Sequence, residues 1–153
     1  MRIIGIRNEG YMRRGFAMEI IEDDYIFTDN ITGIKLDEVC NLLRQSHWAK
    51  NRPTEVIAKT IETSLCFSIY HKDKQIGFAR VVSDYAVYSL ILDVIIDEKY
   101  RGNGLGKKLI EFINNHPSIK NTSKVLWTKY AEGLYLKCGF KEEDCYKFMF
   151  NRP

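Results

Sequence analysis

The stretch DEKYRGNGLGKKL, residues 97–109, joins a long apolar run to an amphipathic one. It carries three glycines at alternate positions: Gly102, Gly104 and Gly106. Glycine lets backbone amides approach a ligand without a Cβ in the way. The start of a helix adds unpaired N–H groups and the positive end of the helix dipole. With Arg101 and Lys107 beside the glycines, the stretch predicts a phosphate or pyrophosphate site at a helix N-terminus.

The sequence excludes two common nucleotide-binding loops, because it departs from the pattern of each at named positions. A Walker A loop has four residues between its first glycine and Gly-Lys-[Ser/Thr], whereas three residues separate Gly102 from Gly106. Lys108 also stands where a Ser or Thr would bind magnesium. The dinucleotide fingerprint needs a third glycine where the chain has Lys107. A tight turn without a ligand is disfavoured, because glycines at a helix start cost stability unless the bare backbone is used.

Hydrophobic periodicity predicts the elements around this loop. Helical spacing predicts helices over residues 34–46, 54–65, 105–113 and 131–138. Alternating or β-branched runs predict strands over residues 66–70, 76–82, 86–96, 124–128 and 145–150. This order predicts an α+β fold with a mostly antiparallel sheet and a right-handed parallel crossover through the helix after the glycines.

Composition limits the class of protein. A chain of 153 residues with 45% hydrophobic residues is long enough for one domain with its own core. The net charge of +3 lies in residues 1–17, which hold four arginines against one glutamate, so the rest of the chain is neutral. A neutral body does not favour nucleic-acid binding. The sequence has no uncharged apolar run of ~18 residues, so it predicts no membrane span.

Residues 1–17 show no hydrophobic period. We therefore expect a loose basic extension that is dispensable for folding, followed by a single domain over residues 18–153. An ordered extra strand is the first alternative, and a targeting peptide is the second.

The four cysteines are Cys40, Cys66, Cys138 and Cys145. No pair has the two-residue spacing of zinc or redox motifs, and each lies within an apolar pattern. We expect buried free thiols, no metal site and a cytoplasmic location.

The motifs together resemble the GNAT superfamily of acyl-CoA-dependent N-acyltransferases. Residues 101–106, RGNGLG, match its Arg/Gln-x-x-Gly-x-Gly/Ala signature. Residues 92–96 are similar to its pantetheine-binding strand, and residues 134–140, LYLKCGF, to its late Tyr-x-x-x-Gly-Phe motif. The resemblance covers about residues 20–150 and is closest to small bacterial-type members of unassigned substrate. It implies a GNAT-like sheet with helices on both faces, in which residues 94–96 splay from a parallel neighbour at 125–128.

The resemblance also implies roles for particular residues, with acetyl-CoA as the co-substrate and no metal. The pyrophosphate would bind the loop residues Arg101, Gly102, Asn103, Gly104, Leu105, Gly106 and Lys107. Pantetheine would bind the backbone of Val94, Ile95 and Ile96, and the N–H of Val94 or Ile95 would polarise the thioester carbonyl.

Tyr135 matches the family tyrosine beside the CoA sulfur and would protonate the departing thiolate. Packing between sheet and helix is the alternative for this side chain. The general base is open among Asp93, Tyr130, Glu132, His47 and water. Asp93 has a structural carboxylate as its alternative role, and His47 is also a candidate wall of the acceptor pocket.

Tyr130 and Glu132 stand where this subgroup often has Asp and His, which weakens a His-mediated step. The remaining histidines, His71 and His116, are expected in solvated turns.

The implied function is transfer of an acetyl group from acetyl-CoA to a primary amine of a small molecule, by direct attack in a ternary complex. A non-catalytic CoA- or acyl-CoA-binding module on the same fold is the alternative. A nucleic-acid-binding domain is a third hypothesis. The basic residues 1–17 suggest it, and the zero net charge of the rest of the chain opposes it. The acceptor amine, and the choice between monomer and homodimer, are left open by the sequence.

Overall fold

The computed structural model describes residues 2–3, 6–7 and 16–151. The strands are β1 (Arg2–Ile3), β2 (Ile6–Arg7), β3 (Phe16–Ala17), β4 (Glu19–Glu22), β5 (Tyr25–Thr28), β6 (Leu65–His71), β7 (Lys74–Ser83), β8 (Tyr88–Ile96) and β9 (Ser123–Val125). The α-helices are α1 (Leu36–Arg44), α2 (Thr54–Thr63), α3 (Leu105–Asn114) and α4 (Glu132–Lys137), with short 3-10 turns η1 (Ile31–Gly33) and η2 (Glu98–Tyr100).

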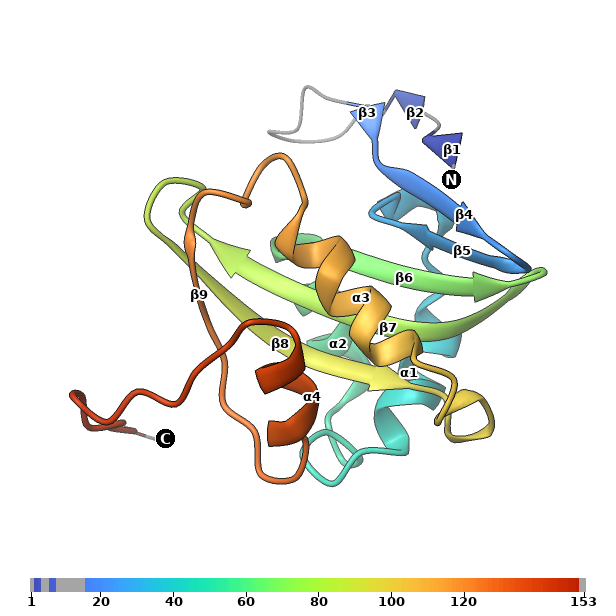
Figure 1. Cartoon of the computed structure of the whole chain (residues 1–153). Helices are drawn as coiled ribbons and strands as arrows, with labels where there is room; N and C mark the ends of the chain where they lie inside the picture. The colour runs from blue at the N-terminus through green and yellow to red at the C-terminus, as the bar shows by residue number, and fades with distance from the viewer. Residues whose placement is uncertain (1, 4–5, 8–15, 152–153) are drawn as a thin grey trace.

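A seven-stranded sheet, ordered β1-β4-β5-β6-β7-β8-β9, forms the centre of the molecule (Figure 1). Every neighbouring pair in it is antiparallel except β8 and β9, which are parallel. The crossover between these two strands runs through α3, as the sequence predicts. The predicted α+β fold with a mixed, mostly antiparallel sheet is therefore confirmed.

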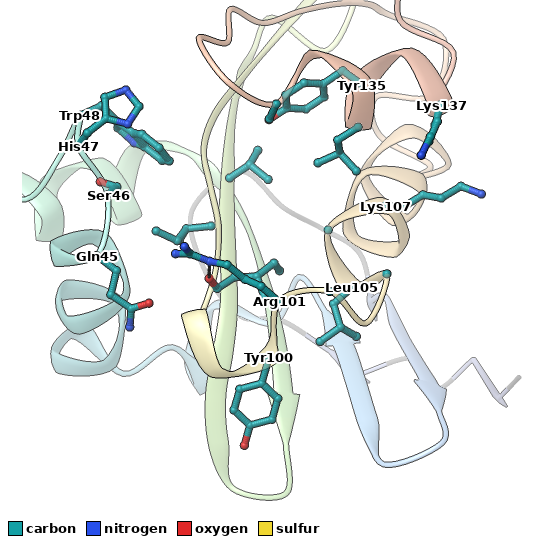
Figure 2. A pocket seen from close by; sticks show the side chains of 18 residues that line it. Gln45, Ser46, His47, Trp48, Tyr100, Arg101, Leu105, Lys107, Tyr135 and Lys137 are labelled. Carbon is teal, nitrogen blue, oxygen red and sulfur yellow. Dashed lines mark hydrogen bonds between the residues drawn. The ribbon is translucent and has the colours of Figure 1, made fainter.

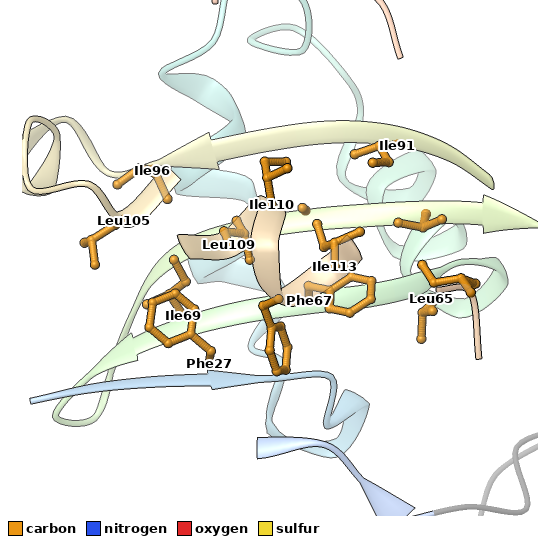
Figure 3. Packing of buried hydrophobic residues seen from close by; sticks show 14 of the residues in the cluster. Phe27, Leu65, Phe67, Ile69, Ile91, Ile96, Leu105, Leu109, Ile110 and Ile113 are labelled. Carbon is orange, nitrogen blue, oxygen red and sulfur yellow. The ribbon is translucent and has the colours of Figure 1, made fainter. Parts of the chain in front are cut away.

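Helices cover both faces of the sheet. In Figure 1, α3 crosses one face while α1 and α2 lie behind the other. Leu109 and Ile113 of α3 are fully buried against Phe67 and Ile69 of β6 (Figure 3). On the opposite face, Leu43 of α1 packs with apolar side chains of the sheet in a second cluster. Full burial of a side chain of this size stabilises the fold by ~1.5–3 kcal/mol.

A bulge in β8 changes which face of the sheet its side chains point to. Ile91 packs in the cluster under α3, whereas Ile95 packs in the cluster under α1. Residues four apart on a regular strand would share one face. The pairing with β7 shifts register at this point, and Asp93 has a left-handed backbone with φ of 53°. The extra residue reverses the in–out alternation of the side chains that follow it. The Asp93 side chain is buried at this point.

The parallel pair separates toward the carboxyl end of β8. Pairing runs from Tyr88–Ser123 to Leu90–Val125 and ends there, whereas β8 continues to Ile96. Within the described part of the chain, no strand flanks the last six residues of β8 on that side. This is the splay that the resemblance implies, but the neighbouring strand is shorter than expected, because β9 ends at Val125 and residues 126–128 form no strand.

The strand predicted over residues 145–150 is not formed. Residues 141–151 have no helix or strand and lie exposed. The alternation suits a strand, but a strand also needs a neighbour, and no strand of the described residues pairs with this run.

His116 is a second difference from expectation, because it is buried rather than solvated. The Ser118 N–H donates to its Nδ1, so its Nε2 carries the proton and donates to Asp29 Oδ2 at 3.0 Å. His71 is half-buried and pairs with the Tyr100 hydroxyl at 3.1 Å. The partners of both histidines are distant in the sequence, so the residues next to His116 and His71 do not predict these contacts.

The expectation for the cysteines is correct for only two of them. Cys40 and Cys66 are buried, Cys138 is half-buried and Cys145 is exposed. Cys145 lies in the segment that does not form its strand, so nothing covers its side chain.

Most of residues 1–17 lies outside the described residues. Arg2 and Ile3 pair with Ile21 and Ile20 of β4, and β2 pairs with β3. These two-residue pairings do not test whether the whole segment is a loose extension. That the segment can be removed without loss of the fold stays a prediction. No helix in the described residues is long and apolar enough to cross a membrane.

Candidate functional site

A cavity of about 650 Å³ opens beside the splayed end of β8 (Figure 2). Four segments build its walls: the end of α1 with the loop after it, the end of β8, the glycine loop with the first turn of α3, and α4. The predicted binding residues line it except Asn103, whose side chain donates to the Tyr100 carbonyl at 3.1 Å. Tyr135 also lines it. The structure thus gathers side chains from distant parts of the chain around one cavity.

The glycine loop exposes backbone where a side chain would otherwise stand. Gly102 and Gly104 have φ of +83° and +75°, a left-handed conformation that favours glycine. A Cβ added to either would meet nothing within 4 Å, so both positions face open space. Gly104 precedes α3 and provides no side-chain cap.

The first turn of α3 therefore keeps unpaired donors. The first hydrogen bond within the helix runs from the Lys108 N–H to the Gly104 carbonyl, at 3.1 Å. The N–H groups of Leu105, Gly106 and Lys107 precede it and have no intrahelical acceptor. An anion at this point would accept them and would also meet the positive end of the helix dipole.

Basic side chains differ in their availability to such an anion. Arg101 lines the cavity and is anchored there by its Nε, which donates to the Ile96 carbonyl at 2.9 Å. Lys107 lines it too and pairs weakly with Glu111 at 3.5 Å. Lys108 instead pairs with Glu22 at 2.7 Å and does not line the cavity.

Tyr135 points its ring into the cavity from α4 (Figure 2). Its ring contacts Phe140 with centroids 5.8 Å apart, and the half-buried side chain packs against the core cluster under α3. Burial, with a smaller contribution from Cys138, raises the pKa of Tyr135 above its ordinary value. The phenol is therefore protonated at neutral pH and is available as a proton donor.

Asp93 lies behind the cavity and is saturated with hydrogen bonds. Its Oδ2 accepts from Arg52 Nη1 at 2.6 Å and Arg80 Nε at 2.7 Å, and its Oδ1 accepts from Arg52 Nη2 and Trp48 Nε1, each at 3.1 Å. Burial alone would raise the pKa of Asp93, but the hydrogen bonds and charges of the two arginines outweigh it and lower the pKa. A carboxylate held in this way is a poor general base.

The Asp93 cluster also fixes the loop between α1 and α2. Trp48 and Arg52 belong to that loop, and both donate to a carboxylate on β8. Sequence reasoning missed Arg52 and Arg80. An arginine at position 80 within an otherwise apolar strand was the available signal, since a buried arginine needs an acidic partner.

The other candidate bases occupy different places. His47 lines the cavity, whereas Tyr130 and Glu132 do not. The His47 ring centroid lies 5.1 Å from that of Trp48 and 5.2 Å from that of Tyr130. These rings join the loop after α1 to the segment before α4. No group of three or more His, Cys, Asp or Glu side chains that could hold a metal occurs among the described residues.

Comparison with known proteins gives a consistent result. The sequence profile of the acetyltransferase (GNAT) domain matches residues 62–142. The chain is 30% identical over 142 residues to the uncharacterized N-acetyltransferase ycf52 of Porphyra purpurea, covering 87% of this chain and 80% of that protein. A ycf52-like N-acetyltransferase of Prochlorococcus marinus is 30% identical over 110 residues, which span only 61% of its length.

Solved structures agree with the sequence relatives. A putative acetyltransferase of the GNAT family from Xanthomonas campestris superposes with a TM-score of 0.77 at 29% identity. The superposition covers 84% of this chain and 92% of that one. The glucosamine-6-phosphate N-acetyltransferase of Arabidopsis thaliana has a TM-score of 0.61 at 18% identity, a likeness of fold alone.

We predict that Asp93→Asn destabilises the protein, because it removes the charge that compensates two largely buried guanidinium groups. Breaking a buried ion pair costs ~3–5 kcal/mol, and asparagine tolerates the left-handed backbone at this position. The pKa of Asp93 is lowered in the folded protein, so its contribution is complete above the ordinary value of 3.8 and is lost as pH falls through the lower folded value. Urea unfolding should give a large stability difference at about pH 7 and a smaller one at about pH 3.

Asp97→Asn is the matched control for this variant. Asp97 is as buried as Asp93, but its partner Lys74 is half exposed and can return to water. We expect a smaller loss of stability from it. Equal losses in the two variants, or a loss in Asp93→Asn that is the same at both pH values, would contradict the role of the arginine pair.

Proposed function

The chain belongs to the GNAT family of acetyltransferases, and on that premise we propose that it transfers the acetyl group of acetyl-CoA to a primary amine of a small molecule. One observation carries the proposal. The bare glycine loop, the unpaired end of β8 and the Tyr135 hydroxyl all open on the same cavity. A ligand that is anionic at one end and amide-rich in the middle suits this arrangement, and acetyl-CoA has both features.

The residues present fit acetyl-CoA as a co-substrate. The empty Cβ directions at Gly102 and Gly104 leave room for a pyrophosphate against the backbone. The N–H groups at the start of α3 would hold it, with Arg101 and Lys107 adding positive charge. Val94, Ile95 and Ile96 would bind the pantetheine amides along the unpaired edge of β8, as a neighbouring strand would.

The proposed chemistry is direct attack of a neutral amine on the thioester carbonyl within a ternary complex. The C–N bond forms as the C–S bond breaks, and acetyl-CoA supplies the activated acetyl group. An N–H of Val94 or Ile95 would stabilise the carbonyl oxygen as it gains charge. Tyr135 would donate its proton to the departing sulfur and regain one from solvent.

The amine must lose a proton before or during attack. Among the four side chains considered as bases, His47 alone lines the cavity. We assign it to the acceptor end, where it would take this proton directly or through a water. The chain's cysteines are free thiols, as a proposed cytoplasmic location requires.

We predict that incubation with acetyl-CoA and pooled primary amines releases thiol and yields an amine heavier by one acetyl group. Thiol release is read with a chromogenic disulfide and the product by mass spectrometry. Reactions without amine give the background rate. Binding of CoA without thiol release for any amine would instead support the non-catalytic CoA-binding alternative.

We predict that Gly104→Val lowers CoA affinity at least tenfold, or ~1.4 kcal/mol. The branched side chain would stand in the open space assigned to the pyrophosphate, and its backbone would resist the left-handed conformation. Calorimetric titration with CoA measures the effect.

Gly139→Val controls for backbone strain, because Gly139 has a similar φ of +87°, faces open space and lies outside the loop. We expect a comparable fall in melting temperature with near-parental CoA affinity. Unchanged affinity in a folded Gly104→Val protein would remove the loop from CoA binding.

We predict that Tyr135→Phe keeps acetyl-CoA affinity and lowers turnover by the ~10²–10⁴ that general acid catalysis supplies. The change is nearly isosteric, so packing against Phe140 survives. A loss confined to turnover marks an interaction made in the transition state. Tyr130→Phe is the control, since Tyr130 is exposed outside the cavity. A change of less than threefold in Tyr135→Phe, with chemistry rate-limiting, would exclude Tyr135 as the acid.

A further inference from the structure

One hydrogen bond joins the end of α1 to the segment that leads into the glycine loop. Gln45 Oε1 accepts from the Glu98 N–H at 2.9 Å, although 53 positions separate the two residues. Residues 45–48 form one wall of the cavity. In Figure 2 the Gln45 side chain points from this wall toward the segment that carries Tyr100 and Arg101. The bond therefore connects two walls of the cavity that come from distant parts of the chain.

The segment that receives this bond, residues 97–101, sets the spacing between the two halves of the co-substrate site. It begins where β8 ends at Ile96 and leads directly to Gly102. The proposed function, on which this inference rests, assigns pantetheine to the end of β8 and the pyrophosphate to the glycine loop. Both groups belong to one ligand, so a shift of the segment between them misplaces one against the other.

The segment is held from two sides. On one side it is bonded to the hairpin of β6 and β7, where the Asp97 N–H donates to the Ile76 carbonyl at 2.8 Å and the Tyr100 hydroxyl pairs with His71 at 3.1 Å. On the other side lies α1. Among the described residues, the hydrogen bond of Gln45 is the one that reaches the segment from the end of that helix.

Gln45 also supplies an acceptor that the segment itself lacks. The first N–H groups of a helical turn have no acceptor within the turn, and η2 begins at Glu98. The Asp97 carboxylate accepts from the Lys99 N–H at 3.0 Å, which leaves the Glu98 N–H for Gln45. The backbone N–H of Gln45 donates to the Leu42 carbonyl at 3.0 Å, so the acceptor is fixed to the end of α1.

We propose that Gln45 is a positioning residue for acetyl-CoA, whose amide oxygen holds the segment before the glycine loop in the conformation that the ligand binds. Affinity falls in proportion to the fraction of the protein that adopts the competent conformation. One hydrogen bond changes such a fraction by about three- to tenfold. Gln45 acts through the backbone of Glu98, and its own contact with the ligand is not required.

The first test replaces the acceptor. Gln45→Met keeps the length of an exposed side chain but has no oxygen. We expect calorimetric titration to show a three- to tenfold loss of CoA affinity, as estimated above, with a near-parental melting temperature. The KM for acetyl-CoA should rise while kcat is unchanged. Gln45→Glu keeps an acceptor oxygen at the same reach and should restore the affinity at ~0.15 M salt, where exposed charges are screened.

Asn41→Met is the matched control on α1. Asn41 lies one helical turn before Gln45, is also exposed, and accepts from Arg44 of the same helix. It does not line this cavity. We expect CoA affinity close to the parental value.

The second test removes the donor instead of the acceptor. Glu98→Pro deletes the N–H at the first position of η2, where proline is well tolerated. Asp97 has ψ of 129°, the extended conformation that a residue before proline prefers. Glu98→Ala keeps the N–H and controls for loss of the carboxylate. If the bond carries the effect, Gln45→Met causes no further loss of affinity in the Glu98→Pro protein.

Three results would overturn the proposal while CoA still binds the parental protein. The first is parental affinity in Gln45→Met. The second is a Gln45→Glu protein as weak as Gln45→Met. The third is an undiminished effect of Gln45→Met in the Glu98→Pro protein, which would mean that Gln45 contacts the ligand directly. Absence of CoA binding by the parental protein would instead contradict the proposed function, and this role of Gln45 with it.

Discussion

The Asp93 carboxylate is the point on which the arrangement of the site depends. It sits at the bulge of β8, and the bulge decides that Ile91 faces α3 while Ile95 faces α1. The same carboxylate accepts hydrogen bonds from Trp48 and Arg52 and so ties the loop after α1 to the sheet. An unpaired buried carboxylate would be costly, so the loop, the strand and Arg80 are held as one unit. One wall of the cavity is therefore fixed by a group that does not itself line it.

The opposite wall is made from backbone. Gly102 and Gly104 adopt left-handed conformations, and α3 begins without a side-chain cap. A capped helix would satisfy its own first turn, whereas this one leaves donors for an anion. β8 behaves similarly, because its pairing with β9 ends at Leu90 and its last residues keep an open edge. Binding by backbone tolerates changes in neighbouring side chains, while the proposed chemistry requires particular ones, namely Tyr135 and His47.

The separation of β8 from β9 affects the structure at both ends of this strand pair. Toward the carboxyl end of β8 it opens the cavity. At the other end β9 is only three residues long, and the side chains of Val82 and Val125 are exposed there.

The sequence by itself determined the four helices, the three central strands and the glycine loop before α3, because these depend on local patterns. Hydrophobic spacing identified the four helices and the strands from 65 to 96, and three alternating glycines before a helix have few uses other than contact with an anion. Tertiary structure decided the rest. The burial of His116 beside Asp29, the pairing of Asp93 with Arg52 and Arg80, and the absence of a strand over residues 145–150 all depend on partners distant in the chain. A local pattern shows what a segment can form, but the neighbour it meets decides whether a strand pairs or a charge is compensated.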